Sequence, residues 1–108
     1  MMIKECESTV KFNYKNIDPD LIDLFPSYLS KRFSELIEVE ALLKVGNFKD
    51  IEVIGHKLCG NAGLFGLDEL AKKAFLLEQA AKSFKSAEVL SISMEMLAIL
   101  EEIRLFIL

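Results

Sequence analysis

The chain has 108 residues, which is enough for one domain with a hydrophobic core but few for two. Hydrophobic residues make up 52% of it, a share typical of a folded chain. Its formal net charge of -4 lacks the basic footprint of proteins that bind nucleic acid, so nucleic acid is not an expected partner.

The first expected element is a short extended segment within an N-terminal leader, residues 1–17. Val10, Phe12 and Tyr14 alternate with polar residues, which is the period of a strand, and no second strand follows to pair with it. A lone strand has to lie across the helices, pair with another chain or stay loose, and we favour a leader that packs on the helices. It has no basic stretch followed by an apolar run, so a signal peptide is not expected.

A short leading helix is expected over residues 19–24, with Asp18 as its N-cap and Pro19 at its first position. From Pro26 onward, apolar residues at steps of three and four predict a longer amphipathic helix. This helix is expected to reach about residue 45 and to end at Gly46.

The same spacing predicts three further helices. One spans residues 47–66, with Asn47 as its N-cap and Gly66 at its end. The next runs over residues 67–81, and a break at residues 82–85 precedes a last helix over residues 86–108. The last helix is the most apolar, but charged side chains recur along it, so a membrane span is not expected.

These elements predict an all-α fold, an antiparallel up-and-down four-helix bundle in which residues 18–108 form a single domain. Cys6 and Cys59 lie far apart, one in the polar leader and one inside a helix, so no disulfide is expected. A reducing cytoplasm is the expected location.

His56 is the only histidine of the chain, and it lies in a glycine-rich helical segment, Gly55 to Gly66. At about 100° per residue it points about 145° away from the apolar stripe of its helix, so it is expected to face solvent. Mid-helix glycines cost about 1 kcal/mol each, and they also serve close helix packing. We expect a flattened surface here, on which a protein partner reaches the imidazole. The expected docking residues are Lys49, Glu52, Val53, Cys59, Gly60 and Gly63.

Glu78 is the expected partner of His56. If the turn at Gly66 folds its two helices into a hairpin, His56 lies ten residues before the turn and Glu78 twelve after it. At about 1.5 Å per residue the two reach similar heights. A hydrogen bond from Nδ1 of the imidazole would satisfy a carboxylate that lies in an apolar stripe, and it would leave Nε2 nucleophilic. The alternative is a glutamate at the edge of the stripe that extends to water.

The segment Gly55 to Gly66 resembles the core motif of histidine-containing phosphotransfer (HPt) domains, with one glycine four residues after the histidine and another ten after it. The similarity includes Phe-Lys-Asp before the motif and Leu-x-x-Leu-Ala after it, and it covers about residues 26–82. It implies a four-helix bundle in a two-component phosphorelay. Its exposed histidine would accept a phosphoryl group from the aspartyl phosphate of a response-regulator receiver domain, or from a hybrid histidine kinase, and pass it on.

Carried over by position, the resemblance makes His56 the phosphorylated residue, Gly60 the glycine that lets a receiver domain approach, and Glu78 the residue that orients the imidazole. The family usually has a lysine three residues after the histidine, beside the phosphoryl oxygens, and this chain has Cys59 there. Lys57 is the adjacent cation and the candidate countercharge, although its direction on the helix differs from that of His56 by about 100°. This departure favours slower transfer or a less stable phosphohistidine.

The sequence has no P-loop and no acidic metal cluster, so no cofactor or metal is expected on this chain, and the Mg²⁺ would belong to the receiver domain. The protein would then carry a phosphohistidine rather than act as a self-sufficient enzyme. A zinc site or a nucleophilic cysteine built from His56 and Cys59 is disfavoured, because neither a closed ligand set nor an oxyanion hole is evident. The main alternative is a non-catalytic helical adaptor that docks a receiver domain or another signalling protein without phosphate exchange.

Overall fold

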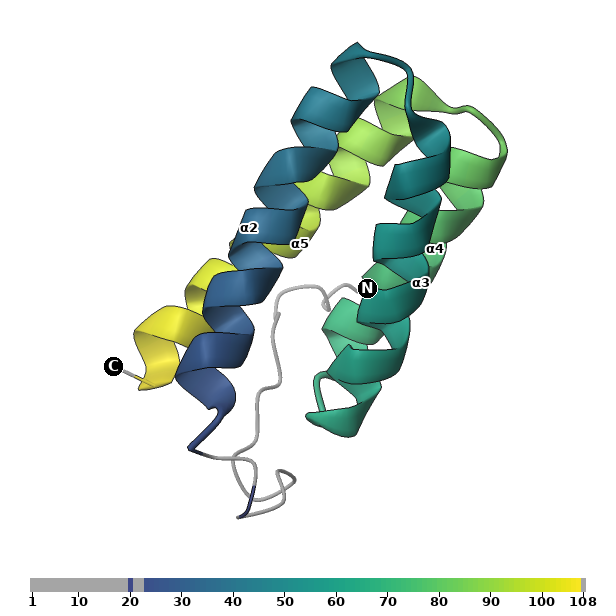
Figure 1. The fold of residues 1–108 in the computed structure, drawn as a ribbon. Coiled ribbons are helices and arrows are strands. Elements are labelled where there is room, and N and C mark those ends of the chain that lie inside the picture. Colours follow the sequence, from purple (N-terminus) through teal and green to yellow (C-terminus); the bar gives the residue numbers. More distant parts are fainter. Residues whose placement is uncertain (1–19, 21–22, 108) are drawn as a thin grey trace, which may run out of the picture.

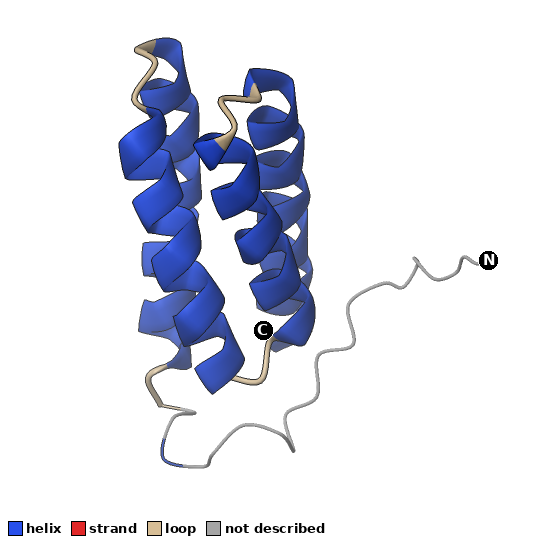
Figure 2. Cartoon of the chain, turned by 90° about the vertical axis from the view of Figure 1, so that its right-hand side faces the viewer, coloured by secondary structure: helices blue, strands red, loops and turns tan. Residues whose placement is uncertain are grey.

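The computed structural model describes residue 20 and residues 23–107, so the expected leader over residues 1–17 lies outside the described part. The chain folds into four helices, α2 (Phe25–Lys44), α3 (Phe48–Leu64), α4 (Asp68–Lys82) and α5 (Ser86–Ile107). They run up and down beside one another with turns at the two ends (Figures 1 and 2), and the described residues contain no strand. The predicted all-α four-helix bundle is confirmed.

The helices end where local chemistry interrupts them. Gly46 and Gly66 have φ angles of 72° and 73°, a left-handed conformation that favours glycine, and they follow α2 and α3 as predicted. The Asn47 side chain accepts a hydrogen bond from the Asp50 backbone N–H at 3.1 Å, so it caps α3. Of the short leading helix expected over residues 19–24, the described residue 20 is helical and residues 23 and 24 form a turn, directly after which α2 begins.

The turn between α4 and α5 has no glycine, and the sequence did not predict how it is made. Phe84 takes the left-handed conformation there, with a φ of 57°. Its exposed ring packs edge-on against Phe48 at the start of α3, with 5.3 Å between the ring centroids. An edge-to-face pair of this kind contributes about 0.5–1.5 kcal/mol, which offsets strain in the turn.

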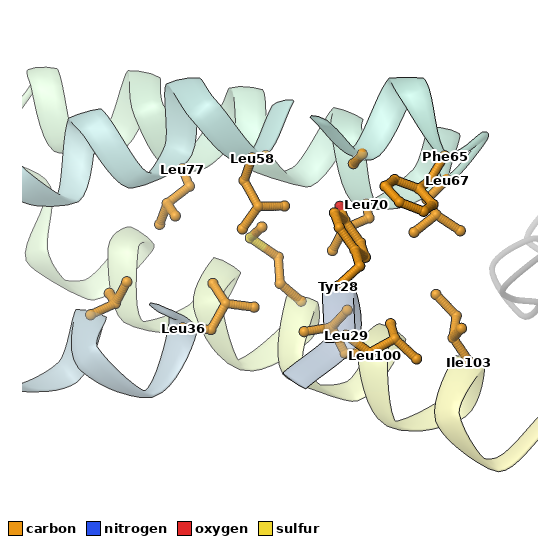
Figure 3. Close-up of a cluster of buried hydrophobic side chains, with 14 of the residues drawn as sticks. Tyr28, Leu29, Leu36, Leu58, Phe65, Leu67, Leu70, Leu77, Leu100 and Ile103 are labelled. Atoms are coloured by element: carbon orange, nitrogen blue, oxygen red, sulfur yellow. The ribbon is translucent and has the colours of Figure 1, made fainter. Parts of the chain in front are cut away.

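The core lies between the α3–α4 pair and the α2–α5 pair. Figure 3 shows Leu58 and Leu77 of the first pair pointing toward Leu36 and Leu100 of the second, and all four are fully buried. Burial of a leucine side chain contributes about 1.5–3 kcal/mol. None of the helices in the described part is both long and apolar enough to cross a bilayer.

The α3–α4 pair packs closely at Gly55. A Cβ built on Gly55 would lie 2.9 Å from the backbone nitrogen of Glu78 and 3.0 Å from the backbone oxygen of Ala74. Real Cβ atoms do not approach backbone this closely, so the position requires glycine. Gly55 is buried and faces α4, so of the two roles that the sequence leaves open for mid-helix glycines, it serves close helix packing.

Candidate functional site

His56 lies on the outer face of α3, and its side chain is 77% exposed. The helix turns by about 100° per residue, so Gly55 on one flank faces α4 while Leu58, two residues after His56, points into the core. The close contact at Gly55 thus fixes which way the imidazole points. The imidazole lies at the solvent-facing edge between α3 and α4, where it contacts Glu78 of α4.

Glu78 comes from α4 and meets His56 across the hairpin. Its Oε2 lies 3.2 Å from Nδ1 of the imidazole, and its side chain is only 11% exposed. An ionised carboxylate only accepts hydrogen bonds, so we assign the proton to Nδ1, which donates it. This assignment leaves Nε2, on the other side of the ring, with a free lone pair open to solvent. The structure therefore brings together His56 and Glu78, which the sequence places at similar heights on the two helices of the hairpin.

Lys82 joins this pair, and the sequence analysis missed it. Its Nζ lies 3.6 Å from Oε2 of Glu78 and 4.0 Å from Oε2 of Glu52. Glu52 precedes His56 by one helical turn and Lys82 follows Glu78 by one turn, so Glu52 and Lys82 lie at the level of the hairpin next to that of His56 and Glu78. We call Glu52, Glu78 and Lys82 the Lys82 cluster. The sequence pattern that could have indicated this cluster is the four-residue spacing from Glu52 to His56 and from Glu78 to Lys82.

Lys57 is exposed and lies on the flank of His56 opposite Gly55. Because Gly55 faces α4, Lys57 starts on the side of α3 that is turned away from Glu78. No ion pair of Lys57 is found within the described residues. The structure thus brings Lys82, and not Lys57, to the carboxylate that holds the imidazole.

The expected docking residues share the outer face of α3, but they differ in exposure. Lys49, Val53, Gly60 and Gly63 are exposed, and Glu52 and Cys59 are half-buried. A Cβ built on Gly60 or Gly63 would meet nothing within 4 Å, so these glycines relieve no clash in the fold. They leave the helix surface one and two turns after His56 without side chains at these two positions.

A shallow apolar groove borders this face, and the sequence analysis did not find it. It lies between α3 and α4, has a volume of about 420 Å³, and is lined by Cys59, Ala71, Lys72, Phe75 and Leu76. Phe75 and Leu76 are about half exposed, at 50% and 47%. Apolar side chains left open next to a reactive group are typical of a surface that a protein partner covers.

A hydrogen bond from α2 holds the histidine-bearing helix on its other side. The Tyr28 hydroxyl donates to Oδ1 of Asn61 at 2.7 Å, and the Tyr28 ring stacks on Phe65 with 4.2 Å between centroids. Burial of the phenol raises the pKa of Tyr28 to about 12, although Arg32 next to it acts in the opposite direction. With α4 on one side and α2 on the other, α3 is fixed on both flanks.

Within the described residues, no three His, Cys, Asp or Glu side chains lie close enough together to hold a metal ion. No family model, no curated protein and no solved structure matches this chain.

Proposed function

We propose that the protein is a histidine phosphotransfer protein of a two-component phosphorelay in the cytoplasm. His56 accepts a phosphoryl group from a receiver-domain aspartyl phosphate or a histidine kinase and passes it to a receiver domain. The observation that carries the proposal is the hydrogen bond from Nδ1 of an exposed imidazole to a buried carboxylate. This contact holds the ring and leaves Nε2 free to act as a nucleophile.

The chemistry needs few groups from this chain. The Nε2 lone pair attacks the phosphorus atom in line, the P–O bond to the donor aspartate breaks, and the carboxylate leaves with the bonding electrons. The ring becomes positively charged as the N–P bond forms, and the Glu78 carboxylate, 3.2 Å from Nδ1, stabilises that charge. The proton stays on Nδ1. The Mg²⁺ that such a transfer uses would be supplied by the receiver domain.

The outer face of α3 supports a macromolecular donor. Gly60 and Gly63 leave space along the helix after His56, and the apolar groove at Phe75 offers area for a partner to bury. A small-molecule enzyme would instead enclose the reactive group in a pocket, and His56 is 77% exposed. We therefore propose that the docking face of Lys49, Glu52, Val53, Cys59, Gly60 and Gly63 receives a receiver domain.

The direct test is transfer of labelled phosphate. The protein is mixed with a receiver domain that carries a radioactive aspartyl phosphate, and the product is examined for label that is lost in acid and retained in base. We expect such label on the wild-type protein and none on His56→Gln. Label that persists in His56→Gln would contradict the proposal.

A non-catalytic helical adaptor is the second candidate. Cys59 stands where a phosphotransfer domain usually has a lysine, and a docking surface alone would need neither that charge nor the imidazole. Binding of a receiver domain to wild type and to His56→Gln with equal affinity, without any label, would favour the adaptor.

Glu78 has a separate prediction. Glu78→Ala removes both the acceptor and the charge, and Glu78→Gln keeps an acceptor without the charge. Because a hydrogen bond to a charged group contributes about 1.5–3 kcal/mol, we expect Glu78→Ala to slow phosphorylation by about tenfold to a hundredfold, and Glu78→Gln to slow it less. Initial rates of labelling measure this, with circular dichroism to check the helices. An unchanged rate in Glu78→Ala would remove the residue from the mechanism.

A further inference from the structure

We infer that Lys82 supplies the positive charge that faces the phosphoryl oxygens on His56, in place of the lysine that Cys59 replaces. This inference rests on the proposed function. Lys82 contacts Oε2 of Glu78 at 3.6 Å, and the same oxygen accepts the hydrogen bond from Nδ1 of His56 at 3.2 Å. Nζ of Lys82 and Nδ1 of His56 therefore contact the same carboxylate oxygen, so these two nitrogens lie no further apart than the sum of those two distances, and the lysine side chain has to turn from there toward Nε2.

The other lysines near this face are less well placed. Lys57 lies on the flank of α3 turned away from α4. Lys49 precedes His56 by seven residues and Lys72 precedes Glu78 by six, which puts each about two helical turns, or about 10 Å, along its helix. Of these four lysines, only Lys82 forms an ion pair with the carboxylate that holds the ring.

The charges of the Lys82 cluster also require a cation there. Glu52 and Glu78 bring two negative charges next to His56, and Lys82 offsets only one of them. A phosphoryl group on Nε2 adds further negative charge, which this pair of carboxylates repels. Lysine is a flexible point charge, and the Lys82 side chain is 47% exposed, so it is free to turn toward the new oxygens.

Glu52 competes for Lys82. The contact between them, at 4.0 Å, is the longer of the two, and leaving it would free the ammonium for the phosphoryl oxygens while Glu78 keeps its place against the imidazole. Removing the charge of Lys82 and removing the charge of Glu52 are therefore expected to change the rate of His56 phosphorylation in opposite directions. Loss of the Lys82 charge slows phosphorylation, and loss of the Glu52 charge speeds it.

The test uses phosphoramidate as the phosphoryl donor, because a small donor does not depend on the docking face. The rate of His56 phosphorylation is followed by ³¹P NMR for wild type, Lys82→Gln, Lys82→Arg and Glu52→Gln. We expect Lys82→Gln to lower the rate about tenfold and Lys82→Arg to restore most of it. Glu52→Gln should raise it about twofold, since an exposed ion pair changes an equilibrium by less than tenfold.

Lys73→Gln is the matched control. Lys73 lies on the same helix and forms an ion pair with Glu95 at 2.9 Å, so this variant loses the same charge and an interhelical contact away from His56. Its rate should equal that of wild type. Raised salt should also narrow the gap between wild type and Lys82→Gln, because Lys82 acts as an exposed charge.

A double variant separates a direct role from one that acts through Glu78. In the Glu78→Gln background, Lys82→Gln should still lower the rate, because its charge acts on the phosphoryl oxygens. No further loss in that background, failure of Lys82→Arg to restore the rate, or a slow Lys57→Gln beside a normal Lys82→Gln would each overturn the inference. If wild-type His56 is phosphorylated neither by phosphoramidate nor by a receiver domain, the proposed function is contradicted together with this inference. If wild type is phosphorylated and Lys82→Gln is phosphorylated equally fast, only the role of Lys82 is contradicted.

Discussion

At the scale of single residues, the geometry of His56 depends on partners from two different helices. Glu78 of α4 holds Nδ1, and Asn61 of α3 is tied to Tyr28 of α2. The first relation could be predicted, because it follows from the helix rise and the position of one turn. The hydrogen bond of Tyr28 could not, because it depends on the distance between α2 and α3, which no local sequence pattern specifies.

Tyr28 predicts a dependence of stability on alkaline pH. Its pKa is raised to about 12 in the folded protein by burial, against 10.0 for the free side chain. The stabilisation is therefore complete below pH about 10 and is lost as the pH rises toward 12, with an amplitude on the order of 2 kcal/mol. Urea unfolding at pH 8 and pH 11 should show this loss in wild type.

Tyr28→Phe is the control for that prediction. It lacks the ionisable phenol and keeps all lysines, so its stability should fall less between pH 8 and pH 11. At pH 8 it should be about 1 kcal/mol less stable than wild type, since Asn61 loses its donor. An equal fall with pH in both proteins would show that Tyr28 does not titrate late.

At the scale of the helices, three glycines of α3 that look alike in the sequence have different roles. Gly55 allows α4 to approach, whereas Gly60 and Gly63 face open space. Gly55→Ala should destabilise the fold by about 1–3 kcal/mol through overpacking against backbone. Gly60→Ala and Gly63→Ala should stabilise it by up to about 1 kcal/mol each, because alanine favours the helix. Thermal or urea unfolding of the three variants measures the contrast, and a uniform effect would contradict it.

The sequence predicted the four main helices to within about two residues at each end, because Asn47, Gly46 and Gly66 are strong local signals. It did not distinguish Gly55 from Gly60, since all mid-helix glycines look the same until the neighbouring helix is in place. It did not predict the place of Lys82, because the motif specifies only residues near His56 on α3. Lys82 comes from α4, the other helix of the hairpin.

At the scale of the whole molecule, the proposed function predicts that Nε2 of His56 and the docking face make separable contributions to phosphoryl transfer. Gly63→Arg places a bulky cation two turns after His56, where the surface has no side chain. We expect at least a tenfold loss of transfer from a phosphorylated receiver domain, and no comparable change in labelling by phosphoramidate. Parallel assays with the two donors measure the difference.

Ile37→Arg is the control for the docking prediction, because Ile37 is exposed on α2 and the change adds the same charge outside the docking face. It should leave both donors unaffected. Equal losses with both donors in Gly63→Arg would mean that the substitution disturbs His56 itself and would remove the argument for a separate docking face.

The left-handed Phe84 has a consequence for Lys82, which lies two residues before it at the last position of α4. The ring of Phe84 packs against Phe48, the first residue of α3, and so joins the end of α4 to the beginning of α3. Without this ring contact, the final turn of α4 would be free to fray. An aromatic pair at the rim of the bundle thus helps to keep the Lys82 ammonium beside the carboxylate of Glu78.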